Sequence, residues 1–285
     1  MGLVLGAGAG SGARRGLATA LNRRRRQHVN PLTAAHRAAT PAPSTDAWRA
    51  AFPHGLDRPL HLDIGSHKGT VPGDRRRVML PPPLTGTRSP LPCGAHRAGA
   101  FLHRLAAALP HYNHLGVEVR APFVETALAH RPPAVADRVH FLVGNAYAEA
   151  IDRLFAHWPL AEVGPPLASV SILFPDPWLK ARHHKRRVAT AALAAALARW
   201  ARPDAVLLFK SDVAEVAQAA TDELGQPASG WAPLLPLTAA APLHAADLAA
   251  AATLPPDVRT LLSVASERER VSPAMWVSVH HRRTP

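Results

Sequence analysis

Residues 170–187 constrain this chain most, because they place a carboxylate at the end of a buried strand. The β-branched and apolar residues of the run 170–174 predict a strand buried on both faces. Pro175 and Pro177 then end it, since neither can donate a hydrogen bond to a sheet. Asp176 lies between these two residues of fixed φ, so we expect its backbone to be stiff. Trp178 follows, with a flat face that suits stacking on a base or capping the core.

A cluster of cations comes next and indicates a polyanionic partner. Seven basic or titratable side chains occupy eight positions, namely Lys180, Arg182, His183, His184, Lys185, Arg186 and Arg187. A charge run is most often only a solvated face. However, the Ala/Leu-rich stretch 188–200 predicts a helix directly behind the cluster, and cations at a helix N-terminus oppose the helix dipole. This position therefore favours phosphate binding.

The segment FPDPWLKARHHKRR, residues 174–187, resembles the signature FPDPW-x-K-x-RH-x-KRR of the tRNA (guanine-N7)-methyltransferases. All the fixed positions are present, in order and without gaps. The resemblance implies an α/β fold of the Rossmann-like S-adenosylmethionine-dependent methyltransferase type, with a mostly parallel seven-stranded sheet and helices on both faces. It further implies methyl transfer from S-adenosylmethionine to N7 of the guanine at position 46 in the variable loop of tRNA, with Asp176 as the catalytic residue.

Composition agrees with a nucleic-acid-binding α/β domain. The chain has 285 residues, of which 47% are apolar, enough for one large domain with a sizeable core. Its net charge of +13 favours tRNA over a membrane as the partner, and no apolar run long enough to span a bilayer occurs. The single Cys93 excludes a disulfide framework and a cysteine zinc site, and we expect no metal. We expect a monomer or weak oligomer; a second protein subunit is an open alternative.

The first 45 residues contain seven arginines and no acidic residue. This composition predicts a basic N-terminal arm or an organellar transit segment, followed by a methyltransferase domain over residues 46–285. The segment RRRRQHVNPL, residues 23–32, also resembles the stretch that precedes the catalytic domain in this family. A chloroplast or other organelle is the expected compartment, with the nucleus or cytoplasm as the alternative.

The expected cofactor loop is interrupted. LHLDIG, residues 60–65, predicts the first strand, and in an open α/β sheet the turn after this strand carries the cofactor. Removing residues 67–96 leaves DIGSRAGAFL, which resembles the family pattern DIG-x-x-x-G-x-F-L with Gly65 and Gly99 as the paired glycines. We therefore predict a 30-residue insert at 67–96, either a surface loop or an artefact of gene prediction.

Two further polar residues lie at the ends of predicted strands. Glu118 lies 53 residues beyond Gly65, or 23 without the insert, close to the spacing of a ribose-binding acid. Asn145 ends the predicted strand 138–146, where either a turn or an adenine contact fits. The residues expected to hold S-adenosylmethionine are Asp63, Gly65, Gly99, Glu118, Asn145 and Asp176.

The C-terminal third supplies the remaining motifs. Residues 205–212 predict a strand that runs into a helix from 213, and Asp212 could cap that helix. SDVAEVA resembles the QSDV-x-EVA motif of plant and cyanobacterial members, with Lys210 at the usual glutamine, and ASERE resembles PTERE. Residues 226–256 predict only loops and short helices, and 275–282 a closing strand. The resemblance assigns substrate binding to Lys180, Arg182, His183, Lys185, Arg186, Arg187, Asp212, Ser266 and Glu269.

Two other functions remain open from the sequence. One is an RNA-binding protein of the same fold that has lost methyl-donor binding because of the insert at 67–96. The other is a dinucleotide-dependent oxidoreductase, since the acidic and glycine residues after the first two strands also suit that fold. The oxidoreductase leaves the basic motif unexplained, and the loop lacks G-x-G-x-x-G spacing.

Overall fold

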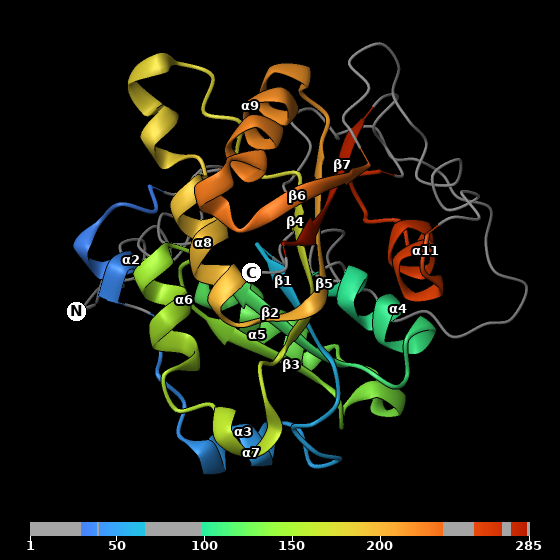
Figure 1. Cartoon of the computed structure of the whole chain (residues 1–285). Helices are drawn as coiled ribbons and strands as arrows, with labels where there is room; N and C mark the ends of the chain where they lie inside the picture. The colour runs from blue at the N-terminus through green and yellow to red at the C-terminus, as the bar shows by residue number, and fades with distance from the viewer. Residues whose placement is uncertain (1–29, 39, 66–97, 236–253, 270–274, 284–285) are drawn as a thin grey trace, which may run out of the picture.

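The protein is a seven-stranded sheet covered by helices on both faces, as seen in a computed structural model (Figure 1). The structure describes residues 30–38, 40–65, 98–235, 254–269 and 275–283. The predicted insert at 67–96 and residues 1–29 of the predicted arm lie outside the described residues. The strands are β1 (Leu60–Ile64), β2 (Asn113–Glu118), β3 (Val139–Val143), β4 (Leu167–Leu173), β5 (Ala201–Ser211), β6 (Trp231–Leu235) and β7 (Trp276–Arg282).

The sheet has the order β3-β2-β1-β4-β5-β7-β6. The pairs from β3 to β5 are parallel, and β7 joins antiparallel to both β5 and β6. The chain order reverses between β1 and β4, so the carboxyl ends of these two strands form the switch point where open α/β sheets bind ligands. The predicted fold class, mostly parallel with seven strands, is confirmed.

Two apolar layers hold the sheet between the helices. Helices α3 (Thr45–Ala51), α6 (Ala148–Phe155), α8 (Ala191–Arg199) and α9 (Ala214–Gly225) pack on one face, and α4 (Ala100–Ala108), α5 (Ala121–Ala129) and α11 (Pro256–Ser263) on the other. Figure 1 shows α6 and α8 to the left of the strands and α4 and α11 to the right. Every residue of β1 and β2 is buried, as expected for central parallel strands.

Shorter elements complete the chain. They are the helices α2 (Ala34–Ala38) and α7 (Leu160–Val163) and the 3-10 helices η2 (Pro133–Val135), η3 (Ala181–Arg186) and η4 (Pro227–Ser229). The helix predicted over 188–200 is α8, which begins three residues later because the Thr190 hydroxyl caps it by accepting the Leu193 N–H at 3.2 Å. Across the described ranges, no helix is long and apolar enough to cross a membrane.

One prediction is wrong. Residues 226–256 were expected to form only loops and short helices, yet Trp231–Leu235 form the edge strand β6. The proline at 233 argues against a central strand but is tolerated at an edge, where one side of the strand needs no sheet partner. Trp231 anchors this strand, since its indole is fully buried and donates to the Ala194 carbonyl at 2.9 Å.

Candidate functional site

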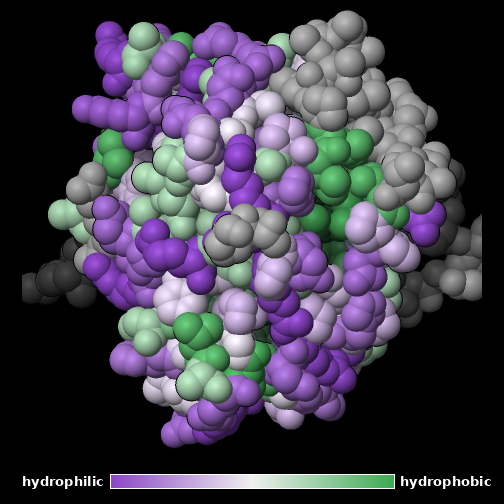
Figure 2. Space-filling view, in the orientation of Figure 1, coloured by the Kyte–Doolittle hydropathy of each residue, from purple (hydrophilic) through white to green (hydrophobic). Residues whose placement is uncertain are grey.

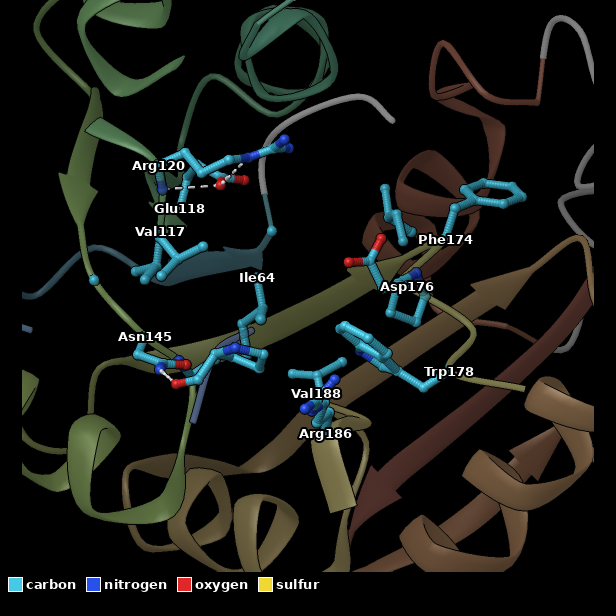
Figure 3. Close-up of a pocket in the computed structure, with 17 residues that line it drawn as sticks. Ile64, Val117, Glu118, Arg120, Asn145, Phe174, Asp176, Trp178, Arg186 and Val188 are labelled. Atoms are coloured by element: carbon cyan, nitrogen blue, oxygen red, sulfur yellow. Dashed lines mark hydrogen bonds and ion pairs between the residues drawn. The ribbon is translucent and has the colours of Figure 1, made fainter. Parts of the chain in front are cut away.

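A cavity of about 170 Å³ opens at the carboxyl ends of the central strands. Figure 3 shows Glu118 and Asn145 on one side of it and Asp176 with Trp178 on the other. Gly65, which follows β1, also lines the wall. Four of the six residues predicted to hold the methyl donor therefore meet at the switch point, although they are far apart in the sequence.

The turn that carries Asp176 is held in an unusual backbone conformation. Phe174 and Trp178, two residues before and two after it, have φ of 50° and 40°, in the left-handed region that non-glycine residues rarely adopt. The Phe174 N–H donates to the Lys210 carbonyl of β5 at 2.7 Å, which fixes the start of the turn. The Asp176 carboxylate points into the cavity (Figure 3).

Glu118 supplies the second carboxylate of the cavity. It ends β2 and is only 6% exposed. Its Oε1 accepts the backbone N–H of Arg120 at 3.0 Å and the Nε–H of the same residue at 3.2 Å. The Arg120 guanidinium also lies 4.2 Å from the centre of the Phe123 ring. The carboxylate of Glu118 is thus fixed in direction by Arg120, which the sequence reasoning missed and which lines the same cavity.

Asn145 joins the N-terminal segment to the cavity. Its side-chain Nδ2 donates to the Pro31 carbonyl at 2.8 Å, and its backbone N–H donates to the Thr40 hydroxyl at 2.8 Å. The Oδ1 accepts the Ala146 N–H at 2.8 Å. Pro31 is itself part of the cavity wall. Asn145, predicted to lie near adenine, therefore holds Pro31 through its side chain and Thr40 through its backbone, both in the predicted arm, against the domain.

The other two predicted donor-site residues, Asp63 and Gly99, do not line the cavity. Asp63 is buried beneath it and accepts a hydrogen bond from Ser171 at 2.5 Å. Gly99 begins α4 with φ 72°, and a Cβ there would lie 2.6 Å from the Phe141 ring and 2.9 Å from Ala127. Gly99 is thus required for the close packing of α4 on β3 and α5.

The basic segment, residues 180–187, forms η3 and the residues beside it. Lys180, Arg182 and Lys185 are exposed, whereas His183 is half-buried with its ring edge-on to Trp178 at 5.7 Å. The cluster lowers the pKa of His183, through partial desolvation and then the nearby cations, of which Arg186 comes first. The upper-left surface over this segment is strongly hydrophilic in Figure 2.

Two arginines of the basic segment turn inward. Arg186 lines the cavity with its guanidinium 5.0 Å from the centre of the Trp178 ring, a cation-π contact (Figure 3). Arg187 donates to the Pro177 carbonyl at 3.3 Å and to Glu215 of α9 at 3.2 Å. These two predicted substrate-binding residues therefore also shape the turn that holds Asp176.

A second cavity, of about 290 Å³, shares Pro175, Asp176 and Val188 with the first. It extends toward α9, whose Glu223 carboxylate accepts the first N–H of α8 at Ala191. The Asp176 turn thus separates two hollows.

The C-terminal segment, residues 265–269, is tied down by charge. Lys210 is fully buried in β5 and donates to Glu269 Oε1 at 2.6 Å, while the other Glu269 oxygen accepts the Ser266 N–H. The Ser266 hydroxyl in turn accepts the Glu269 N–H at 3.3 Å, so the S-x-x-E sequence has the reciprocal hydrogen bonds of a capping box, here around a turn at residues 267–269. Burial lowers the pKa of Lys210, and Glu269 opposes that effect.

The neighbouring charges of this segment are paired as well. Arg268 contacts the Asp212 carboxylate, and Arg104 of α4 donates to Glu267 at 2.8 Å. Asp212, Ser266 and Glu269, three of the predicted substrate-binding residues, therefore lie together at the end of β5, but they do not line the cavity that contains Asp176. Within the described ranges, no group of three or more His, Cys, Asp or Glu side chains could hold a metal ion.

Known proteins resemble this chain over most of its length. The family described as "Putative methyltransferase" matches residues 93–229. The tRNA (guanine-N(7)-)-methyltransferase of Synechococcus sp. (strain JA-3-3Ab) is 37% identical over 75% of this chain and 72% of its own length. That of Synechocystis sp. (strain ATCC 27184 / PCC 6803 / Kazusa) is 35% identical over 70% and 76%. A solved antibiotic-related methyltransferase, 14% identical, aligns with 84% of this chain and 94% of its own at a TM-score of 0.43, too distant to bear on the assignment.

Proposed function

The chain belongs to the tRNA (guanine-N7)-methyltransferase family, and we propose that it transfers a methyl group from S-adenosylmethionine to N7 of a guanine in tRNA. We further propose that the guanine is the one at position 46, in the variable loop. The observation that carries the proposal is the convergence of Gly65, Glu118 and Asp176 on one cavity that the basic segment borders through Arg186. RNA and methyl donor would meet at Asp176.

The residues around the cavity fit a nucleoside with a charged tail. Gly65 has φ 78°, and a Cβ built there meets no atom of the described residues within 4 Å, so a ligand can approach this backbone closely. Glu118, fixed by Arg120, presents a carboxylate where ribose hydroxyls bind in related sheets. Val117 and Ile64 give the same wall an apolar surface suited to a base.

The reaction depends on positioning the guanine and the methyl donor, and it needs no strong base. N7 of guanine is an unprotonated nucleophile at neutral pH. S-adenosylmethionine supplies a methyl group activated by its sulfonium, so the N7–C bond forms as the C–S bond breaks and the electron pair passes to sulfur. The turn around Asp176 holds its carboxylate at the border of the two cavities, where it can orient the purine and favour the positive charge that methylation places on it.

The exposed cations of the basic segment are placed for the RNA backbone. Lys180, Arg182 and Lys185 lie within a few residues of the Asp176 turn, and in the described part of the chain none of them forms an ion pair with a carboxylate. Phosphates bound there would bring a tRNA loop to the edge of the cavity.

The test is transfer of labelled methyl from S-adenosylmethionine to unmodified tRNA by the full chain. We expect one methyl group per tRNA, mapped to position 46 by chemical cleavage at N7-methylguanine. A matched tRNA with adenine at that position is the control and should take up no label. Label at another atom or another nucleotide would contradict the assignment. A version lacking residues 67–96, assayed in parallel, reports whether the insert is tolerated.

A further inference from the structure

A buried chain of hydrogen bonds runs along the sheet beneath the donor cavity. His61 of β1 contacts the Ser169 hydroxyl through Nδ1 at 2.7 Å and the Ser171 hydroxyl through Nε2 at 3.0 Å. Ser171 then donates to Asp63 Oδ1 at 2.5 Å. The pairing register of β1 and β4 sets His61 beside Ser169 and Asp63 beside Ser171, so all four side chains share one face of the sheet.

The direction of every bond in this chain follows from Asp63. An ionised carboxylate can only accept, so the single Ser171 proton goes to Asp63. The Ser171 oxygen must then accept from His61 Nε2–H, which leaves Nδ1 without a proton. Nδ1 therefore accepts the proton of Ser169. All three donors point toward Asp63, and bonds aligned in this way strengthen one another.

The surroundings exclude water from this series of hydrogen bonds and keep His61 neutral. His61 and Ser171 are fully buried, and Ser169 and Asp63 are each 4% exposed. Phe101 of α4 lies edge-on to the imidazole at 6.2 Å and covers it. Burial, and after it the neighbouring His114, holds the pKa of His61 well below its usual value of 6.5. A neutral ring has one donor and one acceptor, as the chain requires.

This series of hydrogen bonds ends at Asp63, at the edge of the proposed donor site. Asp63 is followed directly by Ile64 and Gly65, which line the cavity. We propose that His61 and Ser171 are positioning residues that hold the Asp63 carboxylate in place beneath the cavity, where its negative charge favours the positively charged part of the methyl donor. The inference rests on the proposed function, because it assigns these two residues to the donor site of that enzyme. It gives a role to two of the buried polar side chains in these mostly apolar strands.

His114 provides a matched control position in the same protein. It lies on β2 beside His61, with ring centroids 6.0 Å apart, and is equally buried. Its Nε2 contacts only the Leu109 carbonyl, at 3.2 Å, so it has no hydrogen bond to Asp63 or Ser171. His114→Phe should therefore disturb the packing of this face as His61→Phe does, without affecting the carboxylate.

The experiment is calorimetric titration of the full-length protein with S-adenosylmethionine, with thermal unfolding of the unliganded protein measured alongside. We expect His61→Phe and Ser171→Ala each to raise the dissociation constant about tenfold, the effect of one charge-assisted hydrogen bond. His61→Gln, whose amide can still donate to Ser171, should recover most of the affinity. His114→Phe should bind like the unmodified protein even if it unfolds at a lower temperature.

The outcomes distinguish a failure of the positioning role from a failure of the proposed function. If His61→Phe and Ser171→Ala bind the donor as His114→Phe does, the positioning role is wrong, although the enzyme assignment stands. If the unmodified chain neither binds the donor nor methylates tRNA, the proposed function itself fails. Ser171→Ala removes only one oxygen atom, so it tests the proposal even if His61→Phe does not fold.

Discussion

The basic segment (residues 180–187) and the C-terminal segment (residues 265–269) both match family motifs for the substrate, yet their charges have opposite surroundings. In the basic segment, Lys180, Arg182 and Lys185 are exposed. In the C-terminal segment, consecutive charged residues each pair with a different element, through Arg104, Asp212 and Lys210. Exposed cations are available to a phosphate backbone, whereas the paired charges fix the C-terminal segment against the rest of the domain.

The largest expected effect is the loss of stability on substituting Lys210, the buried partner of Glu269. Lys210→Met should leave the Glu269 carboxylate buried without its cation and cost about 3–5 kcal/mol of unfolding free energy. The double variant Lys210→Met with Glu269→Gln should lose less than the sum of the single changes, because no charge is then left unpaired. Urea unfolding of the four proteins measures this, and additive losses would contradict the pairing.

Acid should destabilise the protein through histidines of the sheet. Burial lowers the pKa of His114 and His280 to about 4 and that of His61 well below 6.5. The unfolded chain binds protons at these sites near pH 6.5 while the folded protein does not, so stability should fall as the pH drops from above 6.5 toward 4. Urea midpoints from pH 8 to 4.5 test this. The slope should be shallower in His114→Phe, and an unchanged slope would count against a buried neutral imidazole.

The role of the exposed cations in the basic segment is tested by measuring RNA binding. Changing Lys180, Arg182 and Lys185 together to alanine should weaken tRNA binding and reduce the slope of log affinity against log salt by about 3. Arg49→Ala with Arg199→Ala is the matched control, because both are exposed cations outside the basic segment. Filter binding at several salt concentrations measures the slopes. Equal slopes in the two variants would show that the basic segment is not the RNA contact.

The smallest expected effect is a difference in stability between variants of Arg187 and Lys185, both in the basic segment. Arg187→Ala should cost about 1–2 kcal/mol of unfolding free energy, because its side chain bonds the Pro177 carbonyl and Glu215. Lys185→Ala should change stability by less than about 0.5 kcal/mol, since Lys185 is exposed. Thermal unfolding measures both, and a reversed order would place Lys185 rather than Arg187 inside the fold.

The sequence predicts the parallel part of the sheet well, because buried parallel strands read as apolar runs that end in polar residues. Glu118 and Asp176 were found on that basis, and both line the cavity. The edge strand β6 was missed because Trp231–Leu235 contains a proline and has little alternation. Edge strands are tolerant of such residues, so their signal is weak.

The contacts around the site were harder to predict, since they depend on register between strands. His61 and Asp63, like Ser169 and Ser171, are two residues apart in buried strands, which places each pair on one face. That spacing was a usable signal, but only the β1–β4 register brings the pairs together. The inward turn of Arg186 and Arg187 likewise follows from three-dimensional packing, whereas the reciprocal hydrogen bonds of Ser266 and Glu269 are local to the S-x-x-E sequence.

The most direct test of the account is single-turnover methyl transfer by Asp176→Asn at saturating tRNA and S-adenosylmethionine. The substitution keeps the shape of the side chain and removes its charge. We predict that the rate of methyl transfer falls by at least about a hundredfold, while the dissociation constant for tRNA stays within about threefold of the unmodified protein. A rate near that of the unmodified enzyme, or a loss explained by weaker tRNA binding alone, would contradict the central role of Asp176.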